Sequence, residues 1–274
     1  MNNSTRHYRG LWLILASAFV FFTVLSAIDD SLVLFGYEFK SSKIWPTLTQ
    51  RKADELDLRG SGRSNAQGNV GTVRNSGPAM PVEVDTVPKT ILFFGDSMLD
   101  GLYPRLAAYA NENGHTLYVV IWYSSTSEVW GRSKKLARYI RDLKPDFIFV
   151  SLGANELFVK NIAEKRDKYV KKILTDIGDI PYVWIGPPNW KEDTGINKLV
   201  ADNAGPHNFF LTKGMQFPRM KDGAHPTHDA AIGWMDSIVR WMPGHSLHPI
   251  KMNVPAQKKA RAKKVFVHQP SEKD

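Results

Sequence analysis

The stretch TILFFGDSM, residues 90–98, joins a short apolar run to a glycine, an acid and a serine. The run at 90–95 predicts a β-strand, and the stretch at 102–114 predicts a helix that ends at Gly114. A strand that turns directly into a helix is the repeating unit of α/β domains. We therefore take this segment as the start of such a domain.

The same alternation of short apolar runs and helix-period stretches continues along the chain. The pattern predicts a largely parallel sheet, because helices placed between strands allow the strands to run in one direction. The further predicted strands are 116–122, 146–153, 181–186 and 208–212, and the further predicted helices are 128–143, 161–178 and 227–242.

Polar segments follow three of these strands and precede the last helix. Ser97 follows the first strand, YSSTS (123–127) the second and GANE (153–156) the third, while KDGAHPTHD (221–229) leads into the final helix. Ligands bind at the carboxyl ends of parallel strands. We expect these four loops to meet at one edge of the sheet.

Ser97 has two possible roles. A serine just before a helix is usually a cap, because its oxygen accepts an N–H of the first turn. It can also be a nucleophile if a base and an orienting acid are present, and His225 and Asp222 supply both. The two roles are compatible at a helix N-terminus. Asp96 is expected to hold the turn, and Asn155 could donate its amide N–H to an oxyanion.

Other interpretations of these loops remain open at this stage. Asp222, His225 and His228 could form a metal cluster, since a His-x-x-His pair beside an acid has suitable ligands. Trp130 and Trp190, in or near strand-end loops, could stack on a sugar ring.

Three of the motifs together resemble the SGNH, or GDSL-like, hydrolase superfamily. They are GDSM (95–98), GANE (153–156) and DGAHP (222–226), in the family's order, and the resemblance covers roughly 89–243. It implies a flavodoxin-like three-layer α/β/α sandwich with a central parallel sheet. It also implies Ser97 as nucleophile, His225 as base, Asp222 as its partner and Asn155 as oxyanion donor, with no metal and no cofactor.

Two positions depart from the family's pattern. The second block normally supplies a glycine whose N–H joins the oxyanion hole, and YSSTS (123–127) has none. We expect the backbone N–H of Ser125 or Thr126 to replace it, so that Ser97, Ser125 and Asn155 form the oxyanion hole. In the third block Glu156 stands for the usual aspartate.

The N-terminal part predicts a membrane anchor. Residues 11–28 are 18 residues without a charge, close to the roughly 20 that cross a bilayer. Basic residues precede this run and two aspartates follow it, which leaves 1–10 in the cytoplasm and the domain in the periplasm. A cleavable signal peptide is the alternative, although LSAIDD (25–30) is a poor cleavage site. We expect a single-pass protein of the bacterial inner membrane.

The terminal segments of the chain carry much of the formal net charge of +9. Residues 29–88 are expected to be a partly flexible linker, because 59–81 is rich in Gly, Ser and Asn. Residues 244–274 are expected to be a basic C-terminal tail that is solvated, and no nucleic-acid partner is expected because no binding signature accompanies it. The chain has no cysteine, which excludes disulfides and a thiol nucleophile.

GDSM, LGANE and SST also resemble a membrane-anchored bacterial branch whose relatives act on acylated envelope polymers. The resulting expectation is a serine esterase that removes acyl groups from an envelope polysaccharide or peptidoglycan. The acyl group that we expect is acetyl. An O-acyltransferase with the same triad is the alternative. A third possibility is an inactive glycan-binding scaffold.

Overall fold

The computed structural model describes residues 32–34, 37–39 and 82–272, and the chain divides into two compact units, Met1–Val70 and Gly71–Asp274. In the first unit, β1 (Leu32–Leu34) pairs antiparallel with β2 (Tyr37–Phe39). The predicted membrane span at 11–28 lies outside the described residues. Within the ranges that are described, no helix is both long enough and apolar enough to span a membrane.

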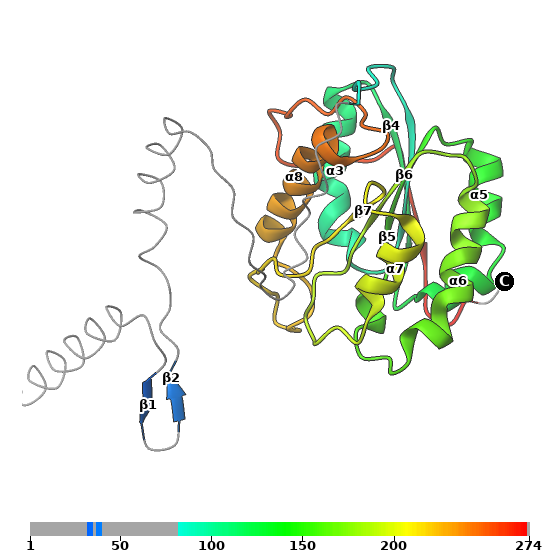
Figure 1. Ribbon diagram of the computed structural model, residues 1–274. Helices are drawn as coiled ribbons and strands as arrows, with labels where there is room; N and C mark the ends of the chain where they lie inside the picture. Colours follow the sequence, from blue (N-terminus) through cyan, green and yellow to red (C-terminus); the bar gives the residue numbers. More distant parts are fainter. Residues whose placement is uncertain (1–31, 35–36, 40–81, 273–274) are drawn as a thin grey trace, which may run out of the picture. The chain divides into compact units, whose positions relative to one another are not determined.

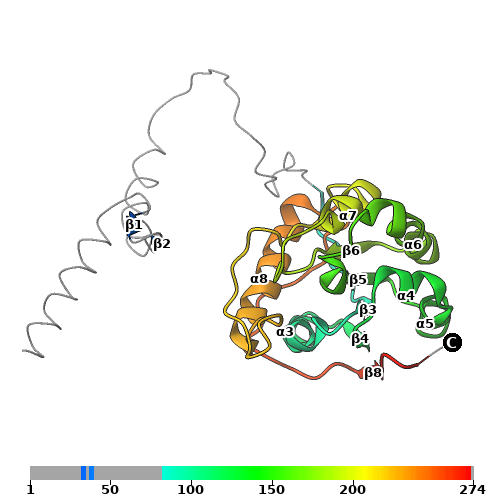
Figure 2. The same cartoon turned by 90° about the horizontal axis from the view of Figure 1, so that it is seen from below.

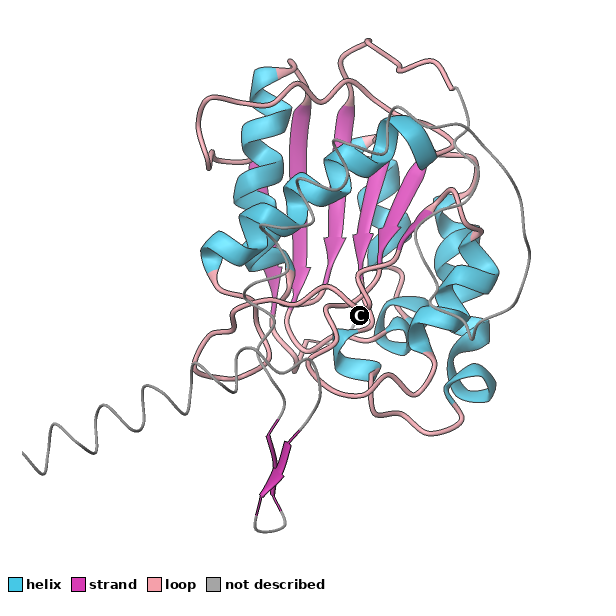
Figure 3. Cartoon of the chain, turned by 60° about the vertical axis from the view of Figure 1, so that its left-hand side comes forward, coloured by secondary structure: helices cyan, strands magenta, loops and turns pink. Residues whose placement is uncertain are grey.

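The second unit is built on a six-stranded sheet in the order β7-β6-β5-β3-β4-β8. All neighbouring strands are parallel (Figures 1 and 3). Among the first five strands of this sheet in chain order, the spatial order is two-one-three-four-five, which is the flavodoxin-like doubly wound order. The strands are β3 (Thr90–Gly95), β4 (Thr116–Trp122), β5 (Phe147–Ser151), β6 (Tyr182–Ile185), β7 (Phe209–Phe210) and β8 (Lys264–His268). The predicted central parallel sheet is confirmed.

Helices cover both faces of this sheet, as Figure 2 shows. α3 (Leu99–Glu112) and α8 (His228–His245) pack together on one face. The other face carries α4 (Ser127–Arg132), α5 (Lys135–Leu143), α6 (Ile162–Ile177) and α7 (Ile196–Ala204). A 3₁₀ helix, η2 (Ala154–Glu156), follows β5.

Two apolar cores result, one on each face. Along β3, Ile91 and Phe93 belong to the core beneath α3 and α8, while Leu92 and Phe94 belong to the core beneath the other helices. All four side chains are fully buried. Successive side chains of β3 point to opposite faces, and both faces are covered by helices. Every position of the strand must therefore be apolar, which gives a continuous apolar run.

The C-terminal segment differs from the expectation of a solvated tail. Residues 264–268 form β8, which pairs with β4 from Tyr118↔Lys264 to Trp122↔His268. The strand is held further because the Tyr139 hydroxyl lies 2.8 Å from His268 Nε2. The apolar pattern of KVFVH is only five residues long and follows a basic run, and this composition concealed the strand.

The predicted boundaries of the domain, 89 and 243, are also too narrow. Asp85 forms a parallel bridge with Ile250, so that segments assigned to the linker and to the tail pair with each other. The helix predicted at 128–143 is two helices, because Ser133 is extended and its Oγ accepts the N–H of Lys135 at 2.9 Å. Helix α7 was not predicted.

Candidate active site

Ser97, His225 and Asp222 form a continuous line of hydrogen bonds. Ser97 Oγ lies 2.8 Å from His225 Nε2, and His225 Nδ1 lies 2.7 Å from Asp222 Oδ2. If Asp222 accepts the Nδ1–H, then Nε2 is left to accept the Ser97 proton. The arrangement joins the turn after β3 to the loop before α8.

The turn after β3 owes its shape to Gly95 and Asp96. A Cβ on Gly95 would lie 1.9 Å from the carbonyl oxygen of Ser151, so no larger residue fits between β3 and β5. Asp96 is fully buried and its Oδ1 accepts the N–H of Met98 at 3.0 Å. Burial raises the pKa of Asp96 to about 7, against the effect of that N–H. The expectation that Asp96 holds the turn is confirmed.

Helix α3 begins at Leu99, and no side chain caps its N-terminus. The capping role proposed for Ser97 is therefore wrong, since its Oγ is turned to His225 and the turn bond is made by Asp96 instead.

The loop before α8 fixes Asp222 and the imidazole together. Asp222 Oδ1 accepts the backbone N–H groups of Ala224 and His225 at 2.9 and 3.0 Å. These two bonds, with the His225 side chain, lower the pKa of Asp222 to about 2. The Arg219 guanidinium stabilises this loop by donating hydrogen bonds to the carbonyl oxygens of Ala224 and Asn189. The acid is thus ionised and oriented over the whole neutral range.

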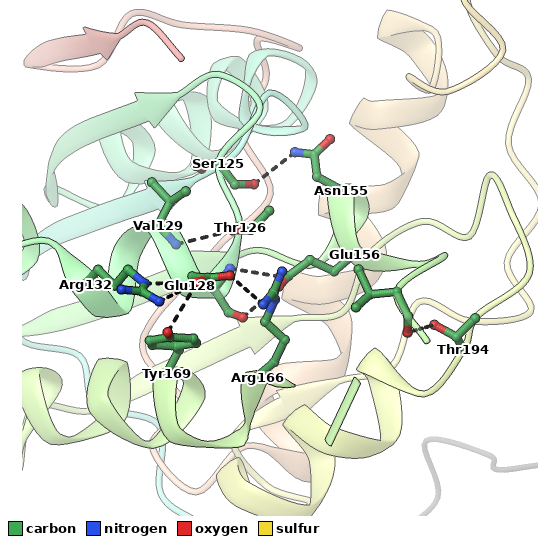
Figure 4. Close-up of polar contacts among 12 residues, drawn as sticks. Ser125, Thr126, Glu128, Val129, Arg132, Asn155, Glu156, Arg166, Tyr169 and Thr194 are labelled. Atoms are coloured by element: carbon green, nitrogen blue, oxygen red, sulfur yellow. Dashed lines mark hydrogen bonds and ion pairs between the residues drawn. The ribbon is translucent and has the colours of Figure 1, made fainter. Parts of the chain in front are cut away.

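Asn155 and Ser125 are brought together, as Figure 4 shows, but the role of Ser125 differs from the prediction. Asn155 Nδ2 donates to the carbonyl oxygen of Ser125 at 3.0 Å. The N–H of Ser125 donates to Trp122 O at 3.1 Å in the turn that ends β4, and its side chain is buried. The prediction of Ser125 as an oxyanion donor is therefore corrected: its N–H is engaged, and its carbonyl orients the Asn155 amide. One hydrogen of that amide has no acceptor among the described residues.

Glu156 forms a buried network behind Asn155 (Figure 4). Its carboxylate accepts the N–H and the Oγ–H of Ser127, both at 2.8 Å, and Nε of Arg166 at 2.8 Å. Arg166 also pairs with Glu128 at 2.5 Å. Burial raises the pKa of Glu156, while these donors favour its anion. The network ties η2 to the start of α4 and so fixes the loop that contains Ser125.

A cavity of about 560 Å³ opens beside Ser97 and His225. Its lining includes Asp100, Tyr123 and Ser124, none of which was predicted as a site residue. Tyr123 donates its hydroxyl proton to Asp100 Oδ2 at 2.8 Å. Two signals in the sequence could have indicated them: Asp100 lies three residues after Ser97, and Tyr123 opens the strand-end loop YSSTS.

The two tryptophans proposed for sugar stacking have different surroundings. Trp130 is fully buried and donates its Nε1–H to Ser125 Oγ at 2.9 Å, so it cannot stack on a ligand. Trp190 is half-buried, donates to Ala154 O at 2.9 Å and contacts the exposed ring of Phe158 edge-on.

The alternative of a metal cluster does not fit the loop before α8. Both ring nitrogens of His225 are engaged, with Ser97 and with Asp222. Across the part of the chain that the structure describes, no group of three or more His, Asp or Glu side chains is placed to hold a metal ion.

No protein-family model and no curated protein sequence matches this chain. Among solved structures it is similar to the psychrotrophic esterase EstA from Pseudoalteromonas sp., with 15% sequence identity and a TM-score of 0.40, over 56% of this chain and 96% of the esterase. It is also similar to the salicylyl-acyltransferase SsfX3 from a tetracycline biosynthetic pathway, with 18% identity and a TM-score of 0.38, over 58% of this chain and 55% of the acyltransferase. Neither likeness, at these TM-scores, identifies a function for this chain.

Proposed function

We propose that this protein is a serine esterase of the SGNH type that removes acyl groups from a polysaccharide or peptidoglycan of the bacterial envelope. The acyl group that we propose is acetyl. One observation carries the proposal. The hydroxyl of Ser97 lies 2.8 Å from an imidazole whose other nitrogen is held 2.7 Å from the carboxylate of Asp222. A serine, a base and an orienting acid in this sequence are the parts of a nucleophilic acyl-transfer site.

In the proposed reaction, Ser97 Oγ attacks the ester carbonyl while His225 Nε2 takes its proton. Asp222 keeps the imidazole in the required tautomer and stabilises the imidazolium. The imidazolium then gives its proton to the departing alcohol, and the acyl group remains on Ser97. Water, activated by His225, attacks this acyl-enzyme and releases the carboxylic acid.

The negative charge on the carbonyl oxygen needs donors that are already in place. The second amide hydrogen of Asn155 supplies one, since the first is committed to Ser125 and fixes the orientation of the amide. The backbone N–H of Ser97 supplies another, close to the start of α3, whose dipole also favours an anion.

Exposure of the triad favours hydrolysis over transfer to a sugar hydroxyl. The side chains of His225 and Asp222 are 32% and 49% exposed, so water reaches the acyl-enzyme from the solvent side. A transferase must exclude water from this intermediate. The intact line of hydrogen bonds likewise supports an enzyme over a scaffold with a relic site.

The proposed location is the periplasmic face of the inner membrane, with residues 11–28 as the anchor. The support for it is the uncharged run of 18 residues and the charges on either side of it. Such a position would bring the domain close to envelope polymers.

The proposal is tested by treating the full-length protein with a fluorophosphonate probe and measuring acetate release from acetylated glycans. We expect labelling of the wild type and of the control Ser237→Ala, which removes an exposed hydroxyl of α8. Ser97→Ala and His225→Ala should lose labelling and at least 10³-fold in activity, the scale seen when triad members are removed. Labelling that survives Ser97→Ala, or a wild type with no ester hydrolysis, refutes the proposal. Acylated sugar formed from an added oligosaccharide would instead indicate transfer.

A further inference from the structure

The cavity beside Ser97 has an apolar side and a polar side. Met98, from the turn before α3, and Ala231 and Trp234, from α8, are buried and form the apolar side. The polar side includes Ser124, His228 and the pair of Asp100 and Tyr123, which are joined by the hydrogen bond of 2.8 Å. A volume of about 560 Å³ lies within the range of roughly 300–1,000 Å³ of small-molecule sites.

The pair of Asp100 and Tyr123 offers acceptors and no free donor of its own. Tyr123 has one hydroxyl proton, and it is donated to Asp100 Oδ2. This bond raises the pKa of Tyr123 to about 12, so the phenol stays protonated at neutral pH. The remaining polar positions of this pair are Asp100 Oδ1 and the lone pairs of the Tyr123 oxygen, all of which accept hydrogen bonds.

The charged residues of the cavity also favour a ligand that donates hydrogen bonds and carries no negative charge. Its lining includes the carboxylate of Asp100, and among the described residues that line it there is no lysine and no arginine. The histidines of the lining are His225, which is bonded to Ser97 and Asp222, and His228. A ligand with its own carboxylate would therefore meet Asp100 without a lysine or arginine to compensate the charge. A ligand rich in hydroxyl protons would satisfy the acceptors.

We propose that Asp100 and Tyr123 bind the alcohol portion of the substrate as an uncharged sugar, accepting hydrogen bonds from its hydroxyls, and that Asp100 disfavours sugars that carry a carboxylate. This inference rests on the proposed esterase function. Of the two halves of an acetyl ester, only the alcohol carries hydroxyl donors, which assigns this wall to the leaving group. The apolar side then contacts the C–H face of the ring.

The experiment compares three acetyl esters with the full-length protein: methyl 3-O-acetyl-glucoside, methyl 3-O-acetyl-glucuronide and p-nitrophenyl acetate, whose alcohol has no further hydroxyl. We expect kcat/KM of the wild type to be at least tenfold higher for the glucoside than for the glucuronide. Asp100→Asn should reduce that preference at least threefold. Asp100→Asn and Tyr123→Phe should each reduce the ratio of glucoside to aryl-ester kcat/KM about tenfold.

Matched substitutions away from the cavity control for general effects. Asp179→Asn, in the exposed loop before β6, and Tyr118→Phe, within β4, should leave both ratios within twofold. All three esters share the acetyl group, so a ratio of two kcat/KM values measures the effect of the alcohol portion alone. The ratio does not change when the fraction of active protein falls.

The outcomes separate this inference from the function on which it rests. If aryl-ester hydrolysis depends on Ser97 but neither ratio changes in the Asp100 and Tyr123 variants, the inference is overturned and the esterase stands. A wild type that cleaves the aryl ester and neither sugar ester, or that prefers the glucuronide, also overturns it. A wild type that cleaves none of the three and is not labelled by a fluorophosphonate refutes the esterase itself.

Discussion

Replacing Asp96 by asparagine should change how the stability of the domain depends on pH. Asp96 is fully buried next to Ser97, and burial raises its pKa from the ordinary value of 3.8 to about 7. Asparagine keeps an oxygen in the place of Oδ1, which accepts the Met98 N–H, and it cannot ionise. The other carboxyl oxygen, Oδ2, has no hydrogen-bond partner of normal geometry among the described residues.

The sign and the size of the effect follow from proton binding. Between pH 3.8 and about 7 the folded wild type keeps a proton on Asp96 that the unfolded chain has lost. The wild type is therefore stabilised at low pH, and this contribution is lost as the pH rises through 7. One pKa unit corresponds to about 1.4 kcal/mol, so the full interval amounts to about 4 kcal/mol. Between pH 4.5 and 8, the stability of Asp96→Asn relative to wild type should rise by about 3 kcal/mol.

Urea unfolding of a chain that begins at Gly71, the first residue of the unit containing the sheet, measures this difference. Tryptophan fluorescence and circular dichroism should give coincident transitions at each pH. Other ionisable groups cancel when the variant is subtracted from the wild type. A difference that changes by less than about 1 kcal/mol over this pH range would refute the reasoning, because Asp96 would then titrate as it does in the unfolded chain.

Two further predictions concern stability. Glu156→Ala should lower the free energy of unfolding by about 3 kcal/mol, because it leaves the buried donors of Ser127 without an acceptor and removes one partner of Arg166. Urea unfolding measures this loss, and a loss below about 1 kcal/mol would show that the network contributes little to stability. Ending the chain after Lys263 removes the whole of β8, including the partly buried Phe266, and should cost at least about 3 kcal/mol in the same assay. A solvated tail would be removable without a change in the transition.

The central part of the fold could be predicted from the sequence because its strands are covered on both faces. Such strands are short uninterrupted apolar runs, and the predicted 90–95 and 116–122 agree with β3 and β4 residue for residue. The edge strand β8 has no such run, because one side of its ladder and part of its surface face solvent. Its basic neighbours then dominate the local composition.

The candidate site, like the fold, could be predicted only in part. Ser97, His225 and Asp222 are recognisable because each supplies a side-chain chemistry at a strand end or a loop. The status of Ser125 depends on its backbone, since a turn with Ser124 at φ +56° engages its N–H, and no side-chain pattern reports that. Asp100 and Tyr123 are distant in sequence and form a pair only because α3 and the end of β4 lie at the same edge.

The parallel pairing of β8 with β4 has a consequence for biosynthesis. Tyr118 and its partner Lys264 are 146 residues apart in the chain. At roughly 5 to 20 residues per second, the ribosome needs on the order of 7 to 30 s to make the intervening segment. During that time the outer edge of β4 has unpaired N–H and C=O groups, which can template association with other chains. Rapid translation of this segment, or a chaperone that shields β4, should therefore increase the yield of native protein.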